Sequence, residues 1–447
     1  MKKKIYCAHT SGKLLRRIAA VGELAVFTGL FSLVCPKSMA AETKLLLLTV
    51  YAMAGGGLLA STDGFAFARL HRPDLLLAQG ISLLLTNAAA WCLLSLLQGQ
   101  LFPWIPMAVL LCGQLLLAAA LVWGCTAALR RLYAPRGVLL IYGSDSAGSL
   151  QNKLNARRHQ FRVQRRISAR EGYDALCREI VNHDSVVIND VPAQLRNDLV
   201  KFCYQKQIPA YVVPKITDII LRGGQNITAF DVPMVLTGMP GLTASQRFWK
   251  RAMDITLSLL ALLPALPVMG AVAAAIRLED GGPVFYKQKR MTCDGREFEI
   301  LKFRSMVVDA EKHGAVLAAK NDTRITRVGR LIRATRMDEL PQLLNILKGD
   351  MSIVGPRPER KVIADAYARD IPEFGYRLRV RGGLTGYAQI YGKYNTQAYD
   401  KLRLDLMYIE NYSLLLDIKL ILMTLRILFS KESTEGVDAP KEEVVCS

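Results

Sequence analysis

The sequence predicts a membrane protein of mixed class, in which a bundle of four transmembrane helices precedes two α/β domains. Three observations support this prediction. Apolar residues crowd into the first 130 of the 447 residues, and again into 252–277 and 402–429. Residues 137–235 alternate short β-branched runs with segments of helical spacing, which is typical of an α/β domain. Opposite charges gather at 335–360, within the last domain.

Four N-terminal stretches are long and apolar enough to cross a bilayer, which takes about 20 residues each. They cover approximately 17–35, 45–62, 75–97 and 105–129. A cleaved signal peptide is the rival interpretation of the first stretch, but Glu23 within it and the spans that follow favour a retained helix. Glu23 would be either a functional carboxylate or, more simply, one that pairs with a neighbouring helix. We assign residues 1–132 to this bundle.

The distribution of Lys and Arg predicts the orientation of the bundle. The chain before the first span, the loop at 63–74 and the segment after the fourth span are rich in basic residues, whereas 98–105 carries no charge. We therefore expect both ends of the bundle, and everything after it, on the cytoplasmic side. Nine cysteines without a C-x-x-C pair fit a reducing compartment better than a disulfide framework or a zinc site.

Residues 133–240 are expected to form a Rossmann-like α/β domain with a parallel sheet. The run "GVLLIYGSDSAGSL" indicates a buried strand, a Gly/Ser turn and a helix start, and short strands are expected at 184–190 and 208–214. Gly143 and Gly148 in the first turn would let a phosphate approach, but the pattern is neither a phosphate loop nor G-x-G-x-x-G. Both a nucleotide site and a plain tight turn in a scaffolding domain remain open.

The apolar run 252–277 predicts a helix that enters the membrane and returns. Pro264 and Pro267 lie in its middle, where proline removes a hydrogen bond and kinks a helix. Basic residues flank the run on both sides, so a complete crossing would place one cluster on the wrong side of the membrane. The competing interpretation is an ordinary fifth span.

Clustered charges then point to a site for an anionic substrate. Lys302 and Arg304 are two apart in a predicted strand, so alternation puts them on one face. Arg330, Arg333 and Arg336 are three apart and would form one basic stripe on a helix. Two adjacent acids follow this stripe and stand just before Pro341, which suits the first turn of a new helix.

The adjacent acids are Asp338 and Glu339, which point in different directions on a helix or turn. One carboxylate is thus free to do chemistry while the other holds a cation; the plainer interpretation is a solvated acidic pair. Arg357, fixed between Pro356 and Pro358, suits bidentate phosphate recognition, with a structural ion pair as the alternative. Several arginines with two carboxylates favour a substrate with several phosphates and a Mg²⁺ ion.

The net charge of +20 agrees with an anionic partner, among which nucleic acid ranks last because no basic run is interleaved with aromatics. From Lys250 to about Ser430 the chain resembles the bacterial sugar transferase family, the polyprenol-phosphate phosphoglycosyl transferases with a single re-entrant helix. The matching motifs are "KRAMDITLS", "GPVFYKQKR", "FEILKFRSM", "RMDELPQLLNILKGDMSIVGPRP" and "RVRGGLTGYAQI". The domains ahead resemble those of the long members, which initiate exopolysaccharide, capsule or O-antigen synthesis.

The resemblance implies a catalytic domain over 247–431, on the cytoplasmic face of the bacterial inner membrane. It would transfer sugar-1-phosphate from a nucleotide diphosphate sugar, by family habit a UDP-hexose, to undecaprenyl phosphate and release UMP. Asp338 matches the nucleophile that forms an aspartyl phosphosugar intermediate, and Glu339 matches the partner acid that helps to hold Mg²⁺. Lys302 and Arg357 match basic residues near the phosphate. Further phosphate contacts are expected from Arg304, Arg333, Arg336 and Arg381.

Some residues depart from the family's pattern. Leu266 stands where the family has a Ser before the Pro at the helix break, Pro264 is an extra proline, and Gly382 stands where Pro is common. A homodimer is compatible with the sequence, the acidic tail at 432–447 is expected to be disordered, and no motif identifies the sugar. Two other functions stay open: a non-catalytic membrane scaffold with a nucleotide-sensing middle domain, and a polytopic transferase or transporter with its site inside the bilayer, for which only Glu23 qualifies.

Overall fold

The computed structural model describes residues 2–67, 70, 72–132, 136–143, 147–155, 161–238, 241–308, 322, 324–392 and 396–428. The tail at 432–447 and the side chains of the basic residues before the first span lie outside this description. The chain divides into two compact units, Met1–Lys215 and Ile216–Ser447.

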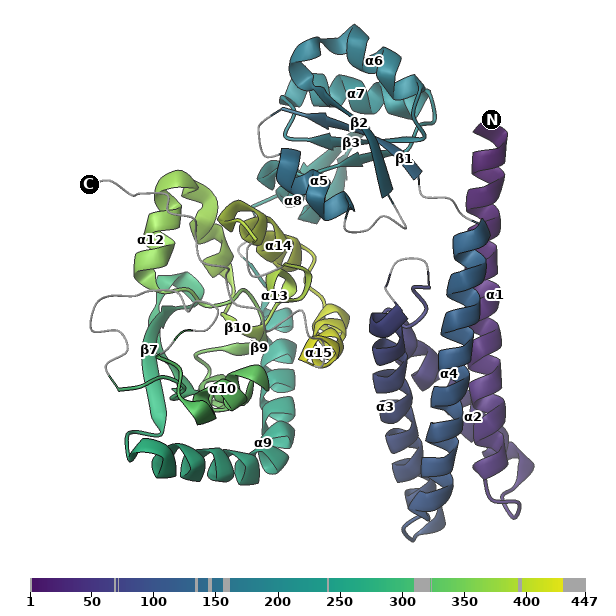
Figure 1. Cartoon of the computed structure of the whole chain (residues 1–447), viewed down its shortest axis with the longest axis vertical. Helices are drawn as coiled ribbons and strands as arrows, with labels where there is room; N and C mark the ends of the chain where they lie inside the picture. Colours follow the sequence, from purple (N-terminus) through teal and green to yellow (C-terminus); the bar gives the residue numbers. More distant parts are fainter. Residues whose placement is uncertain are drawn as a thin grey trace. The chain divides into compact units, whose positions relative to one another are not determined.

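The N-terminal helices are α1 (Lys2–Val34), α2 (Ala41–Ser61), α3 (Arg72–Gln98) and α4 (Trp104–Leu132) (Figure 1). By length and composition α2, α3 and residues 104–128 of α4 are able to cross a membrane, and 18–34 form a shorter apolar helix. Polar side chains meet inside the bundle: the Gln114 amide donates to Tyr51 Oη at 2.8 Å and the Asn87 amide donates to Gln114 Oε1 at 2.7 Å. Such interhelical hydrogen bonds fix helix pairing in lipid. Glu23 is also buried, with 2% of its surface exposed.

The middle domain contains a four-stranded parallel sheet of order β2-β1-β3-β4, made of β1 (Arg136–Tyr142), β2 (Phe161–Ser168), β3 (Ser185–Asn189) and β4 (Ala210–Val212). Helices α6 (Tyr173–Val181) and α7 (Ala193–Gln205) cover one face, where Leu139 and Ile141 are buried. Val138 and Leu140 pack on the other face against α5 (Ala147–Asn155). The sheet is thus covered on both sides, as all-parallel sheets require. The wider likeness to a Rossmann fold stays a prediction.

Gly143 is required by packing at the end of β1. A Cβ atom at this position would lie 1.9 Å from the Asp190 carbonyl oxygen, and its N–H donates to Asn189 O at 3.1 Å. The tight contact joins the ends of β1 and β3. This packing accounts for Gly143 without a ligand, and a nucleotide site in this turn stays a prediction.

The second unit begins with α8 (Ile216–Gly223), which packs on α14 (Ala398–Glu410), and the hairpin of β5 (Gln225–Ala229) and β6 (Val232–Leu236). The sequence predicts a middle domain that extends to residue 240, whereas α8 packs in a hydrophobic core with α14 and so belongs to the second unit. The rest of the unit is built from two small sheets and short helices. Its elements are β7 (Phe285–Met291), β8 (Glu297–Phe303), α10 (Arg327–Ala334), α11 (Gln342–Lys348), β9 (Ser352–Val354), α12 (Lys361–Asp370), β10 (Gly383–Thr385), α13 (Tyr387–Tyr391) and α15 (Leu414–Leu428).

A long apolar helix, α9 (Ala244–Asp280), forms one side of this unit. A capping box between Thr243 and Gln246 starts it, and Pro264 and Pro267, the two prolines expected to kink it, lie inside it. Figure 1 shows α9 as two arms that meet at a sharp bend. Prolines are the usual cause of such a bend because each removes a backbone hydrogen bond.

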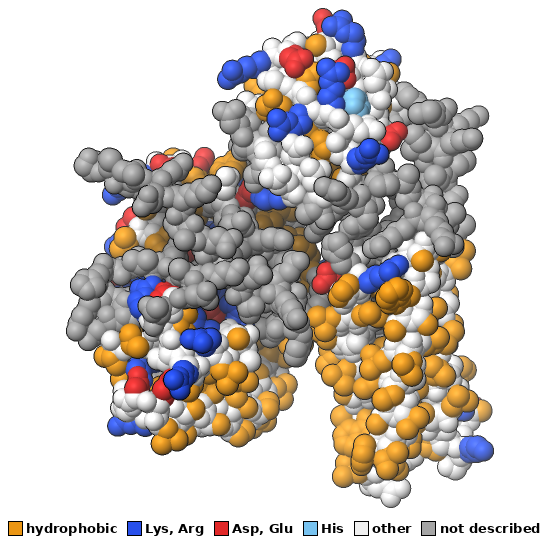
Figure 2. All heavy atoms as spheres, viewed as in Figure 1, with side chains coloured by type: hydrophobic (Ala, Val, Ile, Leu, Met, Phe, Trp, Pro, Cys, Tyr) orange, Lys and Arg blue, Asp and Glu red, His pale blue; other side chains and the backbone are white. Residues whose placement is uncertain are grey.

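Both arms of α9 pack on the same α/β unit. Asp254 on the first arm accepts hydrogen bonds from Ser352 Oγ and Ile353 N in β9, each at 3.0 Å. On the second arm, Met269 and Ile276 join a core with residues of β8. A straight 37-residue helix would be about 55 Å long and could not return to the same unit. Hydrophobic side chains gather on the outer side of α9 (Figure 2); its exposed leucines include Leu259, Leu260, Leu263 and Leu266, near the bend.

Candidate active site

The adjacent acids Asp338 and Glu339 lie in a short 3-10 turn between two helices. Helix α10 (Arg327–Ala334) is capped at its N-terminus by Thr326, whose Oγ1 accepts from Gly329 N at 2.8 Å. Arg336 then adopts a left-handed conformation with φ of 58°, the 3-10 turn covers Met337–Glu339, and α11 begins at Gln342, directly after Pro341. The sequence predicts Pro341 in the first turn of a new helix; that helix is found, with Pro341 at its N-cap, one residue before the first turn.

The predicted stripe of three arginines does not continue on one helix. Arg330 and Arg333 lie on α10, but Arg336 follows the helix end and redirects the chain toward the acids. The reason is local: the left-handed residue breaks the helical repeat on which the stripe was based. Arg333 and Arg336 nevertheless lie close enough to Asp338 for their positive charges to lower its pKa.

Glu339 is the centre of the site. Its Oε1 accepts from Lys302 Nζ at 3.1 Å and from Arg357 Nη2 at 3.0 Å, and its side chain is only 12% exposed. Lys302 comes from β8 and Arg357 from the turn after β9, so three separate segments meet at one oxygen atom. Burial by itself would raise the pKa of Glu339, but the positive charges of Arg357 and Lys302 outweigh burial and hold this pKa far below its usual range.

Asp338 is half-buried and has no hydrogen-bond or ion-pair partner among the residues that the structure describes. Burial, helped by the negative charge of Glu339, raises its pKa, against the opposing effect of Lys302 and the two nearby arginines. Burial also lowers the pKa of Lys302, while Glu339 opposes that shift. The two acids therefore differ: Glu339 is a fixed anion that holds two cations, and Asp338 is a carboxylate with its oxygens uncommitted.

Arg304 was expected to face a substrate phosphate beside Lys302, but the structure gives it another contact. Strand β8 ends at Phe303, and the Arg304 guanidinium forms a bidentate pair with Asp280 and donates to Pro283 O at 2.7 Å. It is 7% exposed and ties the end of α9 to β8. Arg381 is exposed, and its backbone carbonyl packs against Gly355 at the start of the Arg357 turn.

Gly382 has a packing role where the sequence departs from the family's pattern. A Cβ atom there would lie 2.6 Å from Cγ of Pro358, so glycine lets the Arg357 turn approach the segment before β10. Two further arginines, Arg290 and Arg377, donate to carbonyl groups of the same turn and were not expected as site residues. Their only sequence signal is that they occur within the quoted motif "GPVFYKQKR" and just ahead of "RVRGGLTGYAQI".

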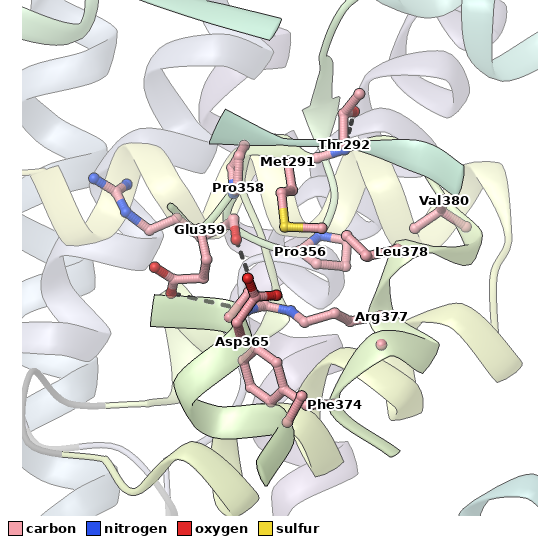
Figure 3. A pocket seen from close by; sticks show the side chains of 15 residues that line it. Met291, Thr292, Pro356, Pro358, Glu359, Asp365, Phe374, Arg377, Leu378 and Val380 are labelled. Atoms are coloured by element: carbon pink, nitrogen blue, oxygen red, sulfur yellow. Dashed lines mark hydrogen bonds and ion pairs between the residues drawn. The ribbon is translucent and has the colours of Figure 1, made fainter. Parts of the chain in front are cut away.

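A cavity opens on the inner side of this turn, lined by Met291, Pro356, Pro358, Phe374 and Leu378 among others (Figure 3). Within the described ranges, no group of three or more His, Cys, Asp or Glu side chains is placed to hold a metal ion. Asp338 and Glu339 offer carboxylate oxygens, the donor type that Mg²⁺ prefers, and Mg²⁺ commonly binds one or two carboxylates together with substrate phosphates. The donor set thus fits a Mg²⁺ ion that arrives with a phosphorylated substrate.

The cluster of two carboxylates with Lys302 and Arg357, beside a bent apolar helix in a chain with further apolar helices, indicates a membrane-associated enzyme that acts on an anionic substrate. A family model described as bacterial sugar transferase matches residues 245–431. The chain is 39% identical over 256 residues to a UDP-N-acetylgalactosamine-undecaprenyl-phosphate N-acetylgalactosaminephosphotransferase of Aeromonas hydrophila, a match that covers 56% of this chain and 60% of that relative.

Two further relatives match a smaller share of this chain but a larger share of their own length. A putative undecaprenyl-phosphate N-acetylgalactosaminyl 1-phosphate transferase of Bacillus subtilis is 49% identical over 146 residues, which cover 32% of this chain and 82% of the relative. A UDP-glucose:undecaprenyl-phosphate glucose-1-phosphate transferase of Caulobacter vibrioides is 41% identical over 191 residues, which cover 41% of this chain and 71% of the relative. The chain belongs to the bacterial sugar transferase family, and the resemblance seen in its motifs is confirmed.

Proposed function

We propose that this protein transfers a sugar-1-phosphate from a nucleotide diphosphate sugar to undecaprenyl phosphate at the membrane surface, to initiate synthesis of a polysaccharide. The observation that carries the proposal is the convergence of Lys302 and Arg357 on Glu339, next to the uncommitted carboxylate of Asp338. The relatives' names, which specify undecaprenyl phosphate and either glucose or N-acetylgalactosamine, support the same reaction class. Because these names differ in the sugar, the sugar used here is left open.

Asp338 is the proposed nucleophile. One of its carboxylate oxygens attacks the phosphorus that bears the sugar, the bond from that phosphorus to the bridging oxygen breaks, and the nucleoside monophosphate leaves with the electron pair. An oxygen of the lipid phosphate then attacks the same phosphorus, and the bond to Asp338 breaks, which regenerates the carboxylate. A covalent step of this kind divides one displacement into two.

Glu339, Lys302 and Arg357 provide the electrostatic environment. The low pKa of Glu339 keeps it ionised, so it holds both cations at fixed positions where charge develops on the phosphoryl oxygens. Asp338 and Glu339 would bind Mg²⁺ together with phosphate oxygens, and the ion would neutralise charge on the transferring phosphate. Arg333 and Arg336 add positive charge beside Asp338.

The bent α9 supports a re-entrant rather than a spanning helix. Both of its arms pack on one α/β unit, while the leucines on its outer side are exposed and apolar. Met337 and Leu340, which flank the two acids, pack on the same core as the second arm. The acids are therefore near the segment that enters the lipid. With the basic flanks, this supports a catalytic unit on the cytoplasmic face of a bacterial inner membrane.

The test traps the intermediate. Purified full-length protein in detergent is incubated with Mg²⁺ and nucleotide sugars labelled in the sugar, without lipid acceptor, and the covalent adduct and released monophosphate are measured. Asp338→Asn should give no adduct, whereas the control Asp370→Asn, an exposed position at the end of α12, should behave as wild type. An adduct that persists in Asp338→Asn would refute the nucleophile. Absence of monophosphate release by wild type with every nucleotide sugar would favour the scaffold.

A further inference from the structure

The turn that carries Arg357 is held by its carbonyl groups. All four carbonyl oxygens of residues 356–359 accept hydrogen bonds from donors elsewhere in the chain. The pairs are Gly383 N to Pro356 O at 2.9 Å, Arg377 Nη2 to Arg357 O at 2.9 Å, Arg290 Nη1 to Pro358 O at 3.1 Å, and Met291 N to Glu359 O at 2.9 Å. Two of these donors are side chains of the arginines beneath the turn. We call these four bonds the carbonyl clamp.

The turn depends on outside donors because it has few of its own. Pro356 and Pro358 lack N–H groups, so they cannot donate within the turn. Their rings restrict the backbone, yet they do not set the direction in which the whole turn leaves β9. The carbonyl clamp supplies that direction, and it thereby decides where the guanidinium of Arg357 lies relative to Glu339.

Arg377 is the best-anchored member of the carbonyl clamp. Its side chain is 5% exposed, and its Nη2 lies 2.8 Å from Oδ2 of Asp405, a residue of α14 whose side chain is 2% exposed. Its Nη1 faces Glu359 Oε1 at 3.8 Å, and Figure 3 shows the side chain reaching toward Glu359 on the inner side of the turn. One planar guanidinium thus joins α14 to the backbone of Arg357.

Arg290 reinforces the same turn from β7. It is held by Gln288 Oε1, at 3.0 Å and 2.6 Å from two of its nitrogens, and Glu359 Oε2 lies 3.7 Å away. Burial lowers its pKa to about 10, so it remains protonated near neutral pH. Its guanidinium can therefore donate to Pro358 O throughout the pH range around neutrality.

We infer that Arg377, with Arg290, is a positioning residue for the transfer reaction, which fixes Arg357 through the backbone of its turn rather than by contact with substrate. The inference rests on the proposed function. Arg377 lines the cavity beneath the turn, but its side chain is 4% exposed and its Nη2 is engaged by Asp405 and by the carbonyl group, not the side chain, of Arg357. A catalytic cation misplaced by about 1 Å costs up to roughly 100-fold in rate.

Arg377→Lys is the informative variant. It keeps the positive charge that Asp405 needs, but the lysine Nζ ends about where the arginine Cζ lies, one bond short of the Nη2 atom that contacts both Asp405 and Arg357 O. We expect kcat for monophosphate release to fall about 10–100-fold, with KM within about threefold and little loss of thermal stability. The matched control is Arg379→Lys: Arg379 lies in the same 3-10 helix as Arg377, Pro372–Arg379, but it pairs with Glu410 and not with the turn. It should retain wild-type kcat.

A double-mutant cycle separates positioning from a structural role. If Arg377 acts through Arg357, Arg377→Lys should cause no further loss in an Arg357→Ala background, where both proteins keep their fold. Additive losses, or wild-type kcat in Arg377→Lys, would overturn the inference. Should Arg377→Lys unfold, Arg290→Lys is subjected to the same cycle and must show the same non-additivity. Failure of the proposed function is distinct, because then the wild-type protein itself would release no monophosphate.

Discussion

Replacing Lys250 by Met should destabilise the C-terminal unit strongly, because it leaves a buried carboxylate without its cation. Lys250 Nζ lies 2.6 Å from Asp417 Oδ2 and also donates to Val354 O at 2.9 Å and to Tyr408 Oη at 3.1 Å. The Asp417 side chain is fully buried and that of Lys250 is 7% exposed. These contacts join α9 to β9, α14 and α15.

The magnitude follows from this burial. Removing one partner of a buried ion pair costs about 3–5 kcal/mol, because the remaining charge loses its compensation. A unit of this size changes its Tm by about 2–4 °C per kcal/mol. Lys250→Met should therefore lower the Tm of the C-terminal unit by about 6–20 °C. Combining it with Asp417→Leu should recover much of the loss, because neither charge then remains buried.

The assay is thermal unfolding of the full-length protein in detergent, followed by tryptophan fluorescence. Trp249 is the only tryptophan in 216–447, and it adjoins Lys250. The control is Lys287→Met: Lys287 pairs with Glu299 at 3.4 Å on the surface, where both side chains are more than half exposed, so a change below about 1 kcal/mol is expected. A Lys250→Met protein that unfolds within 2 °C of wild type, or a double variant no more stable than the single one, would contradict the reasoning.

Three further predictions concern the two acids, the bend and the sheet. Lys302→Gln removes a positive charge that lowers the pKa of Asp338, so this pKa should rise. Because the nucleophile must be ionised, the acid limb of the pH–rate profile should then move to higher pH. An acid limb that stays in place or moves to lower pH would contradict this prediction. Replacing Pro264 and Pro267 by Ala should straighten α9 and move one flank across the membrane, as measured by labelling of engineered cysteines; flanks of the unmodified helix that label from opposite sides would exclude the re-entrant arrangement. Gly143→Ala should destabilise the middle domain by about 1–3 kcal/mol through its contact with a backbone carbonyl, whereas Gly148→Ala, with nothing within 4 Å, should not; equal resistance of both variants to proteolysis would count against the packing argument.

Local patterns predicted the elements whose residues face one neighbour consistently. The segments of helical spacing expected within 137–235 include those found as α6 (Tyr173–Val181) and α7 (Ala193–Gln205). Strand β2 was not expected, because it lies at the edge of the sheet and its sequence FRVQRRIS is rich in arginine, with a single buried residue. Pairing with β1, rather than its own pattern, makes it a strand.

The site was predictable in composition but not in detail. Asp338, Glu339, Lys302 and Arg357 were expected together, and the structure brings the last three to one oxygen atom. Arg304 could not be assigned from alternation, because β8 ends one residue before it. The carbonyl clamp was also outside the reach of sequence reasoning, because its two arginine donors lie 20 and 68 residues from their acceptors.

The bend in α9 has a mechanical consequence. A helix whose first arm is held by the buried contacts of Lys250 and Asp254, and whose second arm belongs to the hydrophobic core of the same unit, cannot slide deeper or shallower in lipid unless those contacts are disrupted. In the proposed arrangement, the acids therefore stay at one height above the acyl chains. A polyprenyl phosphate, anchored by its own tail at the headgroup level, would meet them at that height by diffusion in two dimensions, with no swinging arm needed to carry the sugar to the lipid.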